Sequence, residues 1–127
     1  MENLEEKIQQ IIDSKSLLLY GAKIIAIEMI EGLRIIVPSI RFVGCAVSDL
    51  DGNENELMGL PVKVIDDFQL DVNDTCILIA LGEKYHEVVI QALSEKGYQK
   101  IHVVDTMMRN FIFKRMMQIK LKRLLEN

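Results

Sequence analysis

The stretch 16–33, SLLLYGAKIIAIEMIEGL, constrains the fold more than any other part of this sequence. It opens with three consecutive leucines, the kind of continuous apolar run found in strands that are covered on both faces. Gly21 then turns the chain, and from Ala22 onward apolar residues recur every three or four positions, which defines one face of a helix. The stretch therefore predicts a buried strand, a tight glycine turn and an amphipathic helix.

The rest of the chain continues this alternation of strands and helices. Further strands are predicted over 41–47, 60–65, 76–81 and 101–104, and further helices over 2–14, 85–97 and 106–125. Gly32 is expected to end or weaken the helix that follows the first strand. Right-handed crossovers then give an α/β fold of the Rossmann-like kind: a parallel sheet of about five strands in the order 3-2-1-4-5, helices on both faces and a long C-terminal helix.

Length and composition fit one globular domain. The 127 residues are half apolar, enough for a single domain over 1–127 with an N-terminal helix (2–14), an α/β core (16–105) and a C-terminal helix (106–125). The net charge of −4 argues against a nucleic-acid binder. No apolar run approaches the ~20 residues of a membrane span, and the N-terminus is acidic rather than signal-like. We therefore expect a cytoplasmic protein without a transmembrane segment.

Three loops of the predicted sheet are expected to meet in one crevice. Strands one and four are neighbours where the strand order reverses, and ligands of such sheets bind there, outside the carboxyl ends of the strands. The residues predicted to line this binding crevice are Gly21, Ala22, Lys23, Asp49 and Gly82. The helix that begins after Gly21 directs its free N–H groups at the crevice, which favours a phosphate.

Two residues of this set each allow two interpretations. Lys23 stands where the second glycine of a G-x-G-x-x-G fingerprint belongs, so its side chain either fills the space of a pyrophosphate or pairs with a phosphate as a point charge. Asp49 follows the second strand, where an acidic residue accepts hydrogen bonds from ribose hydroxyls. Asp49 and Asp51 equally suit the opening of a turn.

Residues that would perform chemistry are not recognisable in the sequence. No catalytic residue is assigned, because neither histidine has a nucleophile or metal partner in sequence; His86 lies near the crevice, and His102 is expected to be structural. Cys45 and Cys76 have no metal-ligand spacing and are expected to be buried thiols. No metal site is predicted. The oxygen-rich loop 49–59 does not match a calcium-binding loop. Its glycine is at position four instead of six, and position twelve is Leu60 instead of glutamate.

The C-terminal helix differs from the rest of the chain in charge. Residues 106–127 carry six basic residues and one acid, a net +5, whereas residues 1–105 carry nine basic residues and eighteen acids, a net −9. Its apolar residues exceed what one side of a small sheet can cover, so the helix predicts a partner surface for a second copy, an acidic surface or a downstream catalytic domain. Ordinary core packing and a membrane-surface helix are the alternatives. The ending KLKRLLEN leads us to expect a longer natural protein.

Four segments together resemble a known family. They are YGAKIIA, GCAVSD, MGLPVKVIDDF and DTCILIALGEKYHEVVIQALSEKGYQKIHVVD. In this order they are similar to the Rossmann-like nucleotide-binding N-terminal domain of bacterial polysaccharide biosynthesis proteins. That domain occurs in sugar acyltransferases of the sialic-acid and bacillosamine type, in nucleotide-sugar dehydratases and beside some glycosyltransferases. The family's Gly-Ala-Gly turn matches Gly21 and Ala22 but not Lys23, its acidic strand tip falls on Asp49, and a glycine after its fourth strand falls on Gly82.

The resemblance implies a domain that binds a nucleotide-sugar or a dinucleotide, with NAD and a UDP-sugar as the two ligand classes. It implies a part in bacterial surface-polysaccharide or sugar biosynthesis, within a transferase or another sugar-modifying enzyme. The family's acyltransferases carry their catalytic residues in a C-terminal repeat domain that this chain lacks, so their activity does not carry over. The alternative is an oligomerisation or interaction module of the same fold that has lost ligand binding.

Overall fold

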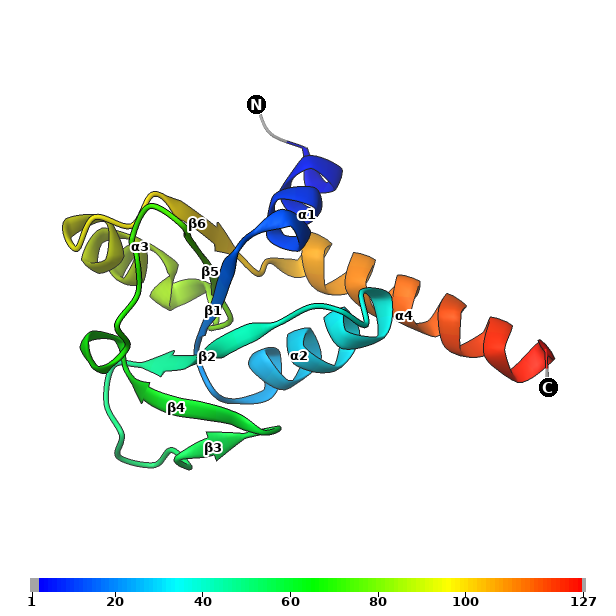
Figure 1. The fold of residues 1–127 in the computed structure, drawn as a ribbon, viewed down its shortest axis with the longest axis horizontal. Helices are drawn as coiled ribbons and strands as arrows, with labels where there is room; N and C mark the ends of the chain where they lie inside the picture. The colour runs from blue at the N-terminus through cyan, green and yellow to red at the C-terminus, as the bar shows by residue number, and fades with distance from the viewer. Residues whose placement is uncertain (1–2, 127) are drawn as a thin grey trace.

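The computed structural model of the chain, which describes residues 3–126, is a mixed α/β structure built on a six-stranded, mostly parallel sheet (Figure 1). The strand order is β3-β4-β2-β1-β5-β6, and only the β3–β4 pair is antiparallel. The strands are β1 (Ser16–Tyr20), β2 (Phe42–Val47), β3 (Glu56–Leu57), β4 (Leu60–Val64), β5 (Thr75–Ile79) and β6 (Lys100–Val103). β1 and β5 are neighbours at the centre and are almost completely buried, as their continuous apolar runs require.

The strand β3 is absent from the sequence prediction. It pairs with β4 through a two-residue turn, Met58-Gly59, in which both residues have positive φ, 51° and 85°. Such turns favour asparagine, aspartate or glycine at both central positions. Methionine at the first of them gives no turn signal, and a two-residue strand has no hydrophobic period.

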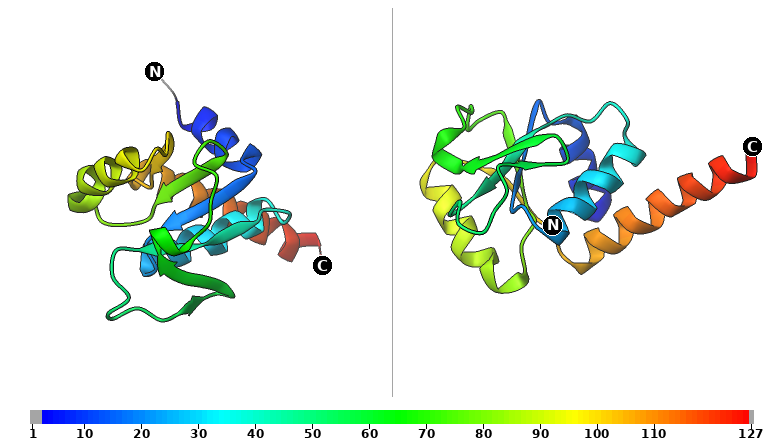
Figure 2. Two further views of the ribbon diagram at one scale, coloured as in Figure 1. Left: turned by 60° about the vertical axis from the view of Figure 1, so that its left-hand side comes forward. Right: turned by 90° about the horizontal axis from the view of Figure 1, so that it is seen from below.

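Helices cover both faces of the sheet (Figure 2). α1 (Leu4–Asp13), α2 (Ile24–Ile36) and α4 (Thr106–Glu126) share one apolar core with the sheet, to which they contribute Ile11, Ile30 and Ile112. α3 (His86–Glu95) packs in a second core on the other face. There are also two short 3₁₀ turns: Ile65–Asp67 follows β4, and Glu83–Tyr85 precedes α3.

α1 packs on one face of the sheet and belongs to its core. Ile8 and Ile11 are buried in the same core as α2 and α4. The helix begins after Asn3, whose side-chain oxygen accepts a hydrogen bond of 2.8 Å from the backbone N–H of Glu6. The predicted start at residue 2 lies outside the described residues.

α2 and α4 approach each other closely at Gly32. The prediction that this glycine ends α2 is wrong, because the helix continues to Ile36 and Gly32 is buried within it. A Cβ at this position would lie 2.3 Å from Cγ2 of Ile112. The close contact between the two helices therefore requires glycine at position 32. Arg109 of α4 spans the same pair of helices with a two-pronged ion pair to Glu28, at 2.9 and 2.7 Å.

Cys45, in the middle of β2, is a buried thiol. Burial raises its pKa from the ordinary 9.0 to about 11, with Arg34 opposing the shift to a smaller extent. A thiol with this pKa stays protonated and unreactive near neutral pH.

Within residues 3–126, the helices are all too short or too polar to cross a membrane.

We predict that Gly32→Ala destabilises the protein by about 1–3 kcal/mol, because the new methyl group forces α2 and α4 apart. Urea unfolding measures the change. Gly82→Ala is the matched control, since a Cβ there meets nothing within 4 Å, and it should change stability by less than ~0.5 kcal/mol. Ile112→Leu, which removes the clashing γ2 methyl, should restore part of the loss. Equal effects of Gly32→Ala and Gly82→Ala would contradict the close contact.

We predict that Cys45 makes the folded state lose stability as the pH rises from 9 towards 11. The unfolded chain ionises this thiol at the lower pH and the folded chain only at the higher one, so alkali favours unfolding by up to about 3 kcal/mol. Cys45→Ala lacks this contribution. Urea unfolding of both proteins across this range should show their stability difference shrinking with pH, and a constant difference would refute the assignment.

Candidate functional site

The turn between β1 and α2 lies where three strand ends meet. Gly21 has φ 126°, and its N–H donates a 2.8 Å hydrogen bond to the carbonyl of Ala46 in β2. On the other side, a Cβ at Gly21 would lie 2.5 Å from the carbonyl oxygen of Ala80, just after β5. Both the positive φ and this close approach require glycine, which is what the first position of a phosphate-binding turn demands.

α2 begins directly above this turn, and its first turn is open to an anion. Lys23 is its N-cap residue and makes no side-chain capping bond, and the first turn contains no acidic residue. The backbone N–H groups at the start of a helix and its positive dipole end favour a negatively charged group. Ala22 is half-buried and packs against the core beneath, which fixes the turn on the sheet.

Lys23 joins the first loop of the crevice to the second. Its side chain is exposed, and its Nζ donates a hydrogen bond to the carbonyl oxygen of Gly52 in the loop after β2. The ends of the two strands are tied again by a 2.7 Å hydrogen bond between the hydroxyls of Tyr20 and Ser48. An ammonium group has three N–H donors, so the bond to Gly52 occupies only part of its capacity.

Asp49 forms the turn that its sequence context allows. One carboxylate oxygen accepts a 2.9 Å hydrogen bond from the N–H of Asp51, and the side chain of Asn53 donates to the carbonyl of Asp49. This is an Asx turn, completed by Gly52 with φ 76°. Asp49 stays exposed at the tip of β2, so its place in the chain suits a ribose contact as well.

Gly82 lies in a separate part of the crevice. It lines a hollow of about 440 Å³ outside the carboxyl ends of β5 and β6. The hollow is bounded by the start of α4 (Thr106, Arg109), by His86 and by Ile25 of α2, whereas Gly21, Lys23 and Asp49 are not among its lining residues. Gly21 lies next to this hollow, because a Cβ there would lie 3.0 Å from Cδ2 of Leu81, which lines the hollow beside Gly82.

His86 is held by the backbone. Its Nε2 lies 2.9 Å from the carbonyl oxygen of Leu81, so the ring fixes the start of α3 while also bordering the hollow. His102 is buried within β6. Among residues 3–126, no three His, Cys, Asp or Glu side chains are grouped to hold a metal ion.

Sequence reasoning missed Arg109 as a crevice residue. Its guanidinium lines the hollow while bonded to Glu28, and this hydrogen bond raises the pKa of Arg109 further above its ordinary value. Asp105 begins α4 by accepting a 2.9 Å hydrogen bond from the N–H of Met108. The sequence contains no signal for an ion pair between residues 28 and 109.

Comparison with known proteins finds no matching family model, curated protein or solved structure. The resemblance to the polysaccharide-biosynthesis domain therefore stays a hypothesis that rests on the four quoted segments.

Proposed function

We propose that the chain is a Rossmann-like domain that binds a nucleotide-sugar or a dinucleotide at the carboxyl ends of β1, β2 and β5. It serves a glycosyltransferase or another sugar-modifying protein of bacterial surface-polysaccharide biosynthesis and performs no chemistry by itself. The observation that carries the proposal is the turn at Gly21. Its closely packed backbone, with the positive φ of Gly21, leads into an α2 N-terminus without a side-chain cap.

The sheet supports this assignment. Without the short β3, the strands run in the order β4-β2-β1-β5-β6, and the chain reverses direction across the sheet between β1 and β5. Ligands of doubly wound sheets bind at such a reversal. The phosphates would lie over Gly21 and the first turn of α2, with the ribose at Asp49. The other half of the ligand would occupy the hollow of about 440 Å³ beside Gly82 and Arg109.

Lys23 has a definite part in this arrangement. Its ammonium group is already fixed between the loops after β1 and β2 by the carbonyl of Gly52. A cation at this point adds its charge to the positive end of the α2 dipole, and together they attract a phosphate. It would replace the close backbone approach that a second glycine permits in related fingerprints.

We predict that NAD or a UDP-sugar raises the melting temperature of the 127-residue chain by about 10 °C, at a ligand concentration about 100 times the Kd. A thermal-shift panel of nucleotides identifies the ligand, and titration calorimetry gives its Kd. Lys23→Met should weaken binding about tenfold through loss of the phosphate contact. Asp49→Asn, which can still form the turn, should weaken it by a similar factor through the ribose.

Lys100→Met serves as the control, because Lys100 is exposed at the opposite edge of the sheet, at the start of β6. It should leave the Kd unchanged. A flat thermal response to the whole panel would contradict the proposal.

The second candidate is an interaction module of the same fold whose crevice is closed. It is favoured by one observation, the bond that fixes Lys23 to Gly52 between the two loops. In that case Lys23→Gly should create or strengthen nucleotide binding. The two candidates thus predict opposite effects of removing this side chain, and the same calorimetric titration distinguishes them.

A further inference from the structure

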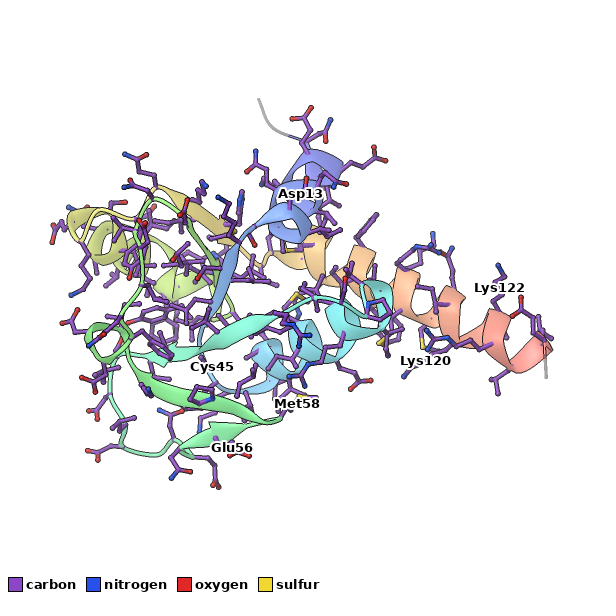
Figure 3. The ribbon with its side chains drawn as sticks, viewed as in Figure 1. Asp13, Cys45, Glu56, Met58, Lys120 and Lys122 are labelled. Carbon is purple, nitrogen blue, oxygen red and sulfur yellow. The ribbon has the colours of Figure 1, made fainter. Side chains whose placement is uncertain are left out.

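The loop between β2 and β3 contains the only aspartate or asparagine of the sequence that is followed by glycine. This pair, Asp51-Gly52, lies in the segment that leads from β2 into the β3–β4 hairpin, on which Figure 3 shows Glu56 and Met58. Both residues of the pair are exposed, and a Cβ at Gly52 would meet no atom within 4 Å. Exposed loop tips of small and polar residues are where a backbone is most open to covalent change.

The pair forms the centre of a β-turn. The N–H of Asn53 donates a 3.0 Å hydrogen bond to the carbonyl of Leu50 and closes the turn. Gly52 has φ 76°, whereas the φ of Asp51 is negative, and this combination defines a type II turn. Rotation of the peptide unit between the two central residues converts a type II turn into type I and leaves the closing hydrogen bond in place.

This central peptide unit can rotate without breaking a hydrogen bond. Within residues 3–126, the carbonyl and carboxylate of Asp51 and the N–H of Gly52 take part in no hydrogen bond. The groups on either side are bonded: the N–H of Asp51 donates to Asp49 at 2.9 Å, and the carbonyl of Gly52 accepts from Nζ of Lys23. The nitrogen of Gly52 and the carboxyl group of Asp51 are therefore adjacent and unbonded, between two anchored ends.

We propose that Asp51 is a site of spontaneous succinimide formation and converts to isoaspartate in the folded protein. The nitrogen of Gly52 attacks Cγ of the protonated Asp51 carboxyl group, and a bond forms between these two atoms. The hydroxyl of the carboxyl group leaves as water with the amide proton of Gly52, and a cyclic imide results. Water then cleaves the imide. Cleavage of the bond from nitrogen to Cγ restores aspartate, and cleavage of the bond to the main-chain carbonyl carbon gives isoaspartate.

Glycine at position 52 makes this reaction accessible. It has no Cβ to crowd the attacking nitrogen, and its open surroundings leave room for the cyclic imide. Asp49 provides a comparison within the same loop. Leu50 follows it, so its neighbouring nitrogen is crowded, and its carboxylate is already bonded to the N–H of Asp51. Asp49 should therefore stay unmodified.

Isoaspartate at position 51 would change the candidate crevice. It adds one methylene group to the main chain between residues 51 and 52, so the dihedral angles of the type II turn no longer apply. The carbonyl of Gly52 then moves away from Lys23, and the bond between the loops after β1 and β2 is lost. The modification is independent of the proposed nucleotide binding, because isoaspartate forms whether or not the crevice holds a ligand.

The first test incubates the full chain in mildly acidic buffer, below its melting temperature, and measures isoaspartate at residues 49 and 51. Isoaspartate leaves the mass of a peptide unchanged, but it shifts its retention in reversed-phase chromatography and gives diagnostic fragments in electron-transfer dissociation. The product should accumulate at Asp51 and not at Asp49. The folded chain should react within about tenfold of the rate of the chain unfolded in urea, as expected of a site without protecting bonds.

Two variants provide controls for the chemistry. Asp51→Glu keeps the charge but places the carboxyl group one methylene further from the nitrogen of Gly52, so the product should be lost. Asp51→Asn needs no protonated carboxyl group and releases ammonia in place of water. It should react faster than the unmodified chain at neutral pH and raise the mass of the peptide. Residue 51 is exposed, so circular dichroism should report an unchanged fold for both variants.

The second test measures hydrogen exchange in the isoaspartate form after chromatographic separation. The N–H of Asn53 closes the turn in the unmodified chain, and it should exchange about fivefold faster or more once this bond is lost. The N–H of Val62, which donates to the carbonyl of Asn55 further along the loop, is the internal control and should keep its exchange rate.

Three outcomes would overturn the proposed modification. The first is an unmodified Asp51 in the folded chain while the unfolded chain accumulates isoaspartate, which means that the turn protects the site. The second is equal product at Asp49 and Asp51, and the third is equal product in Asp51→Glu and the unmodified chain. Unchanged exchange of the Asn53 N–H in the isoaspartate form would contradict the loss of the turn. Failure of nucleotide binding would leave the modification standing.

Discussion

The contact between α2 and α4 determines most of what this chain presents to its surroundings. With no side chain on Gly32, the two helices pack so closely that Cγ2 of Ile112 takes the space of the missing Cβ. The ion pair between Glu28 and Arg109 then fixes their register along the axis. Because α2 starts at the end of β1 and α4 at the end of β6, this contact sets one helix start beside the other at the same edge of the sheet. It also directs the rest of α4 into solvent.

The elements that the sequence predicts well are those whose signal is local and repeated. The leucines of β1 and the apolar run of β5 are buried on both faces, and the helical spacing of α2, α3 and α4 reappears in the buried side of each helix. β3 was missed because its pairing depends on a Met-Gly turn in an uncommon conformation. Gly32 was misinterpreted because the residue that leaves no room for a side chain there, Ile112, lies 80 residues further along the chain.

The candidate crevice could be predicted only in part for a similar reason. Gly21 was recognisable, since a strand, a glycine and a helix in sequence define its turn. The destination of the Lys23 side chain depends on the loop after β2, and the role of Arg109 depends on Glu28. These are long-range contacts between charged groups, for which spacing in the sequence carries no information. Gly82 follows β5, but the hollow that it lines is bounded by the start of α4, and no local pattern in the sequence places α4 there.

Arg109 lies between two cavities of the molecule. Its guanidinium belongs to the lining of the hollow at the strand ends and also to the lining of the groove between α2 and α4. One side chain is therefore a common wall of two compartments. A bound anion that drew this cation away from Glu28 would reshape the neighbouring compartment at the same time. Binding of a ligand in either cavity would then change the binding free energy of a ligand in the other. The change would be equal whichever ligand binds first.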